Sequence, residues 1–138
     1  MKRVVVVSDG PVHLETAQGA LAAAGWEAVT VAVVSEARAQ LESGALAVVV
    51  AVPGLEGAGE RLGPVLASPA TVRRGYVVAA VGPGLRSGDG RQAFALGVDL
   101  TVGPGDVARL GELISVAVAT KRALVAPLDP LAAARLGG

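Results

Sequence analysis

The stretch Ala45-Leu-Ala-Val-Val-Val-Ala-Val52 is apolar at every position. A strand that is buried on one face alternates apolar and polar residues, whereas a strand covered by helices on both faces has no polar side. This stretch therefore predicts a central strand of a parallel sheet. Pro53 and Gly54 follow it and mark the turn at its end.

Four other short runs rich in Val or Ala resemble this one, and segments with helical patterns separate them. We expect strands at Val4–Val7, Ala28–Val34, Ala45–Val52, Tyr76–Val81 and Leu100–Val102. We expect helices at Pro11–Ala24, Ser35–Gly44, Gly57–Leu66, Gly90–Leu96 and from Asp106 to about Leu124. Strands that alternate with helices predict an α/β domain with a doubly wound, five-stranded parallel sheet between two helical layers, in flavodoxin-like strand order.

The length of 138 residues suits one domain. We expect this domain at residues 1–124. The tail at residues 125–138 contains two prolines and ends in two glycines, so it is either a linker or a short extra helix.

Composition excludes several classes of partner. Twelve basic and twelve acidic residues give a net charge of zero, so no field attracts nucleic acid or an anionic membrane. No apolar run approaches the length that spans a bilayer. Cysteine is absent, which excludes disulfides and thiolate metal sites and fits a cytoplasmic protein.

Four segments, taken in chain order, resemble the receiver domain of response regulators. They are Arg3-Val-Val-Val-Val-Ser-Asp-Gly-Pro11, Gly25-Trp26-Glu27, Pro53-Gly54-Leu55-Glu56-Gly57 and Ala95-Leu-Gly-Val-Asp-Leu-Thr-Val-Gly-Pro104. The resemblance covers about residues 2–124. It implies a flavodoxin-like signalling domain that acts on other proteins.

The departures from this family point to a degenerate phosphorylation pocket. The resemblance implies an acidic pair after strand one for magnesium, a phospho-acceptor Asp ending strand three, a hydroxyl after strand four and a Lys after strand five. Hard oxygen ligands and a cation are needed for that chemistry. The residues at these positions here are Ser8 and Asp9, then Val49, Ala51 or Val52, then Val81 and Gly103. We therefore expect a pseudo-receiver with no enzymatic activity, no metal and no cofactor.

The last helix suggests a working surface. Its core stripe is extended on one side by Leu113 and Val116, so the apolar arc is wider than one buried face requires. A helix sunk deeply between its neighbours would explain this arc, and so would a docking surface, which the resemblance favours. We expect partner contacts at Arg91, Gln92, Arg109, Leu113, Val116 and Thr120. The partner is another protein, an attached output domain, or a second copy bound through the last two helices.

Two alternatives remain open. Loops that contain Pro-Gly follow three strands, and such loops can form a small-molecule site at the carboxyl edge of the sheet. A small α/β enzyme is the other alternative, although no nucleophile, base and oxyanion donors are visible together. We expect the single histidine, His13, to be a surface residue, and Trp26 to pack half-buried at the exit of the first helix.

Overall fold

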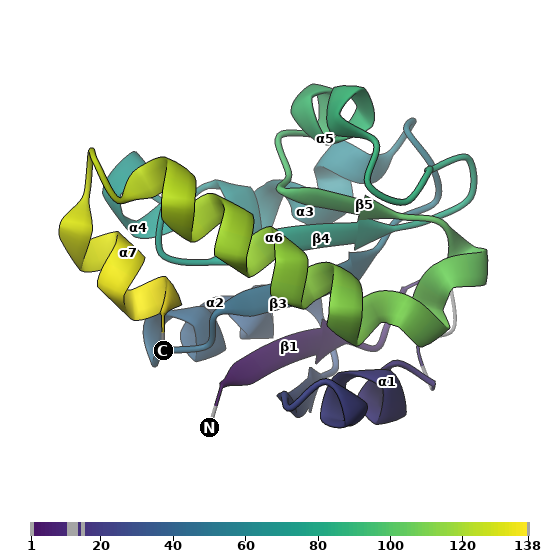
Figure 1. The fold of residues 1–138 in the computed structure, drawn as a ribbon. Coiled ribbons are helices and arrows are strands. Elements are labelled where there is room, and N and C mark those ends of the chain that lie inside the picture. Colours follow the sequence, from purple (N-terminus) through teal and green to yellow (C-terminus); the bar gives the residue numbers. More distant parts are fainter. Residues whose placement is uncertain (1, 11–13, 15, 138) are drawn as a thin grey trace.

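A computed structural model describes residues 2–10, 14 and 16–137, and within them the chain forms a single parallel sheet (Figure 1). The strands are β1 (Arg3–Val7), β2 (Glu27–Val31), β3 (Ala47–Ala51), β4 (Val77–Val81) and β5 (Leu100–Val102). All pairings are parallel and the order is β2-β1-β3-β4-β5. This is the flavodoxin-like α/β arrangement, so the expected fold class is confirmed.

Helices cover both faces of the sheet. One face packs against α1 (Ala17–Ala23) and α6 (Leu110–Val125), which crosses the front of the sheet in Figure 1. The other face packs against α2 (Val34–Glu42), α3 (Ala58–Leu66) and α5 (Gly90–Leu96). None of the helices in the described ranges is long and apolar enough to cross a membrane.

The burial of β3 explains its continuous apolarity. Every residue from Ala47 to Val52 has an exposed fraction of 0%. Val49 and Ala51 belong to the core cluster beneath α1 and α6, whereas Val48 and Val50 belong to the cluster beneath α2 and α3. Because helices cover both faces, neither face of the strand leaves a position for a polar side chain.

Several element boundaries differ from the expected ones. The second strand ends at Val31, three residues early, because Val34 begins α2 and is buried in the core there. Ser35 is therefore inside α2 and Val33 is its N-cap, with no side-chain capping bond. The described part of the first helix is α1, at Ala17–Ala23.

Two short helical elements were not expected from the sequence. The single turn α4 (Ala70–Arg73) precedes β4, and the 3-10 helix η1 (Pro104–Arg109) leads from β5 into α6. Both lie in segments where proline begins a turn, and neither is long enough to show helical periodicity.

The segment after α6 contains a short helix, α7 (Pro130–Leu136), which is one of the two alternatives expected for residues 125–138. Asp129 caps this helix, since its Oδ1 accepts a hydrogen bond from the Ala132 amide at 3.1 Å. Leu136 is 1% exposed and belongs to the core beneath α6. Arg135 donates a hydrogen bond to the carbonyl of Leu41. The packed unit therefore extends beyond Leu124, where we expected the domain to end.

Candidate functional site

At the carboxyl edge of the sheet, an arginine from α3 bridges the ends of β1 and β3. Arg61 Nη2 donates to Asp9 Oδ1 at 2.8 Å, and Arg61 Nε donates to the carbonyl of Ala51 at 2.9 Å. The hydrogen bond from Arg61 is the main cause that lowers the pKa of Asp9 below its ordinary value, and partial burial opposes it. Gly10 allows this close approach, because a Cβ there would lie 2.4 Å from the Cβ of Ala51.

The other positions of the degenerate pocket carry no free polar side chain toward this edge. Ser8 Oγ donates to the carbonyl of Val31 at 3.1 Å, so its hydroxyl bonds to β2. The four apolar positions each have an exposed fraction of 0%: Val49, Ala51, Val52 and Val81. They lie in the two core clusters rather than in an open site.

Gly103, which the resemblance placed where receiver domains carry a lysine, is part of a closed loop contact. Its amide donates to Ser87 Oγ at 2.9 Å, and Ser87 Oγ donates to Asp106 Oδ2 at 2.5 Å. A Cβ at Gly103 would lie 3.0 Å from the carbonyl oxygen of Leu85. Close backbone packing therefore accounts for glycine at this position.

Packing also explains a second glycine of the Gly-Pro loops. A Cβ at Gly82 would lie 2.4 Å from the carbonyl oxygen of Val52, so only glycine fits where the ends of β3 and β4 meet. Close packing without a ligand is thus a sufficient reason for Gly82 and Gly103. The small-molecule alternative stays a prediction, and nothing in these loops favours it over packing.

Beside Arg61 lies an open hollow of about 340 Å³. Its lining includes Asp9, Glu60 and Arg61, so two carboxylates share it with one guanidinium. Among the residues that the structure describes, no three His, Cys, Asp or Glu side chains gather as metal ligands would. His13 lies outside the described residues.

A second hollow, of about 390 Å³, runs along α6 beside β5, and we call it the α6 groove. Four of the six residues expected to contact a partner line it, namely Arg109, Leu113, Val116 and Thr120. Leu100, Ala117 and Leu124 add apolar surface. Val116 is 62% exposed, whereas Leu113 is partly buried against the core. The wide apolar arc of α6 therefore includes one residue that packs against the core and one that faces solvent.

The remaining two expected contacts lie on α5 and do not line the α6 groove. Gln92 is bonded to the preceding loop: its Oε1 accepts from the Arg86 amide at 2.7 Å, and its Nε2 donates to the Gly84 carbonyl at 2.9 Å. The amide of Arg91 donates to Asp89 Oδ1 at 3.0 Å, and Arg91 is exposed. The structure therefore brings together the α6 residues but not this pair.

One end of the α6 groove is formed by a charged network that the sequence did not reveal. Lys121 Nζ lies 3.1 Å from Asp99 Oδ1 and donates to the Tyr76 carbonyl at 2.5 Å. Arg73 Nη2 also pairs with Asp99, at 2.7 Å. Burial lowers the pKa of Lys121 to about 8, although the Asp99 carboxylate opposes this shift. At least 22 residues separate any two of these three charged side chains in sequence, so no local pattern links them.

Arg61 was also missed, although one signal could have pointed to it. It is the only basic residue of α3, which begins directly after the loop that follows β3. A lone cation at this place would meet the carboxyl edge of the sheet, where Asp9 lies.

The chain was compared with protein-family models, with curated proteins and with solved structures, and nothing matched.

Proposed function

We propose that this chain is a receiver-like domain that acts through a protein–protein contact without being phosphorylated. The observation that carries the proposal is the position of Arg61, whose guanidinium pairs with Asp9 and bonds to the Ala51 carbonyl. A guanidinium stays charged at every physiological pH. It therefore pairs with Asp9 across the physiological pH range, without a metal ion or a phosphoryl group, and this favours one fixed state of the edge over a switch.

The proposed binding surface is the α6 groove. Two exposed apolar side chains, Val116 and Leu124, line it. At the rim, Arg109 lies 3.7 Å from Glu112 and 4.0 Å from Asp106, so the rim charges already have partners. An apolar centre with a polar rim is the common anatomy of a protein interface.

The occupant we propose is a second copy of this chain. The paired rim charges leave no excess charge for a strongly acidic or basic partner to recognise. The chain also has a net charge of zero, so two copies approach without long-range repulsion. A twofold contact would place the same apolar patch on both sides. We also propose a cytoplasmic location, which the absence of cysteine supports.

The chemical half of the proposal is tested with acetyl phosphate and magnesium. We expect the intact mass of the chain to stay unchanged, because no carboxylate occupies the strand-three positions. Calorimetry with magnesium should give no saturable heat, because the ion needs several well-placed oxygens and releases its waters reluctantly. A phosphoryl adduct on a carboxylate would contradict the proposal.

The binding half is tested by sedimentation velocity over a wide range of chain concentration. We expect reversible self-association that Val116→Glu weakens by about tenfold or more, because the charge would be buried in an apolar contact. Ala123→Glu is the matched control, since Ala123 is an exposed α6 residue that does not line the groove. A chain that stays monomeric at every concentration, or equal weakening by both variants, would refute this surface.

A further inference from the structure

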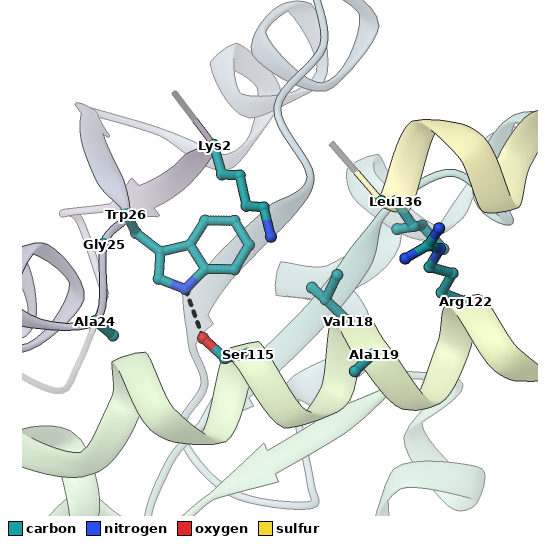
Figure 2. A pocket seen from close by; sticks show the side chains of 10 residues that line it. Lys2, Ala24, Gly25, Trp26, Ser115, Val118, Ala119, Arg122 and Leu136 are labelled. Atoms are coloured by element: carbon teal, nitrogen blue, oxygen red, sulfur yellow. Dashed lines mark hydrogen bonds between the residues drawn. The ribbon is translucent and has the colours of Figure 1, made fainter.

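On the other side of α6 from the groove lies a smaller pocket, which we call the Trp26 pocket (Figure 2). Its volume is about 140 Å³. It is enclosed by the turn after α1, the residue before β1, the middle of α6 and the end of α7. We expected Trp26 to be half-buried, but it is 4% exposed. Its Nε1 donates to Ser115 Oγ at 2.9 Å, which fixes the indole ring as one wall.

The lining of this pocket has a one-sided charge. Among the described residues that form it, two are cationic, Lys2 and Arg122, and none is acidic. Figure 2 shows the Lys2 ammonium and the Arg122 guanidinium on opposite sides of the hollow, with Val118 between them.

Both cations are exposed residues, and each lies against another part of the pocket. Lys2 Nζ lies 5.8 Å from the centre of the Trp26 ring, within the range of a cation–π contact. The backbone of Gly137 packs against the Arg122 guanidinium, because a Cβ at Gly137 would lie 2.8 Å from Arg122 Cζ. The end of α7 therefore helps to position Arg122 at the pocket.

We propose that the Trp26 pocket binds a small organic anion. Its carboxylate would lie between Lys2 and Arg122, and its apolar part would contact Trp26 and Val118. A guanidinium can donate two parallel hydrogen bonds to a carboxylate, and an indole face accepts apolar groups. The volume is close to the roughly 150 Å³ of an engineered protein cavity that binds benzene, which suits a carboxylic acid with a short chain. This proposal does not rest on the α6 groove, since Ser115, Val118 and Arg122 lie outside the groove lining.

The proposal is tested by titration with butyrate at constant ionic strength. Trp26 is the only tryptophan of the chain, so its fluorescence reports on this pocket alone. We expect saturable butyrate binding, weaker acetate binding, and no binding of the neutral butyramide. Inorganic phosphate is included as an anion without an apolar part, and it should therefore bind less tightly than butyrate. Phosphate binding as tight as butyrate binding, or equal binding of butyramide, would overturn the proposal.

Single substitutions then test whether Arg122 and Lys2 bind the carboxylate. Arg122→Gln and Lys2→Gln should each weaken butyrate binding by about tenfold, because each removes a charged hydrogen-bond donor. Arg38→Gln is the control, since Arg38 on α2 carries an equal charge and pairs only at the surface with Glu42, at 3.6 Å. It should leave butyrate affinity unchanged. Absence of saturable binding in the unaltered chain, or equal losses in all three variants, would refute the proposal. Circular dichroism should confirm that each variant is folded.

Discussion

Replacement of Arg61 by methionine tests whether this side chain stabilises the carboxyl edge of the sheet by bridging the ends of β1 and β3. Arg61→Met keeps an apolar stem of similar length and removes the guanidinium. Two contacts are then lost, the 2.8 Å pair with Asp9 and the 2.9 Å hydrogen bond to the Ala51 carbonyl. We expect the variant to fold, since the core residues beneath α3 are unchanged.

The magnitude follows from the burial of the two contacts. A hydrogen bond from a charged donor contributes about 1.5–3 kcal/mol, and Ala51 is fully buried, so its bond lies near the middle of this range. The side chains of Arg61 and Asp9 are 20% and 33% exposed, so solvent screening limits their pair to about 0.2–1 kcal/mol. The methionine stem recovers part of this by packing, which gives a net loss of about 2 kcal/mol.

Such a loss is easily measured. An unfolding entropy of about 2.1 cal/mol/K per residue amounts to about 0.3 kcal/mol/K for 138 residues. A loss of about 2 kcal/mol therefore lowers Tm by about 7 °C. Urea unfolding near pH 7 should give the same difference in the free energy of unfolding.

The pH dependence separates the two contacts. The pKa of Asp9 is lowered in the folded state, so its pair with Arg61 stabilises the fold above the ordinary pKa of 3.8. This contribution is lost as the pH falls through the lowered value. The bond to Ala51 persists, because Arg61 stays charged. The difference in the free energy of unfolding between the unaltered chain and Arg61→Met should therefore become smaller in acid but not vanish.

The matched control is the same substitution in a chain that carries Asp9→Asn, which removes the carboxylate. In that background the effect of Arg61→Met should be smaller and should not change with pH. If Arg61→Met is as stable as the unaltered chain, or if its deficit is the same at about pH 7 and at about pH 3, the inferred role of Arg61 is refuted.

Three further predictions concern the core, the degenerate pocket and the charged network. Leu136→Ala should lower the free energy of unfolding by about 2–5 kcal/mol, because this residue is buried. The control Leu131→Ala, at a residue that is 84% exposed, should change it by less than about 0.5 kcal/mol. Equal effects would show that α7 is not part of the core. Val49→Asp should place a carboxyl with a raised pKa at a fully buried site and lower the free energy of unfolding by at least about 3 kcal/mol near neutral pH. Urea unfolding should show a smaller loss in acid, where the carboxyl is neutral. Because burial lowers the pKa of Lys121 to about 8, the unfolded chain binds more protons than the folded chain above that pH, so stability should rise from about pH 8 to pH 10.5. Lys121→Met should lack this rise in thermal unfolding, and an identical rise in both chains would contradict the assigned pKa.

Local sequence signals predicted much of the fold. Gly90–Leu96 and Leu100–Val102 were expected with the bounds that the structure has. Asp89 caps α5 by accepting from the amides of Arg91 and Gln92, and Gly97 ends the helix with a φ of +75°. Such signals act between residues only a few positions apart, so they can be read from the chain directly.

Helical periodicity predicted which residues of α6 are apolar but not what covers each of them. Leu113 and Val116 extend the same arc, yet Leu113 packs against the core and Val116 is 62% exposed. The difference depends on the angle and depth at which α6 crosses the sheet. That placement is set by the packing of α6 against α1, β4 and β5, which no single helix encodes.

The sequence by itself determined the parallel sheet, the alternation of helices and strands, and the lack of an acidic side chain in Ala45–Val52, because these depend on residue type and local spacing. Only the tertiary structure decided which distant side chains meet. Asp9 and Arg61 are 52 positions apart, and Trp26 and Ser115 are 89 apart. A hydrogen bond requires its two atoms to lie within about 3 Å. That distance depends on how whole helices pack against the sheet. Both the Arg61 bridge between β1 and β3 and the Trp26 pocket therefore depend on the assembled fold.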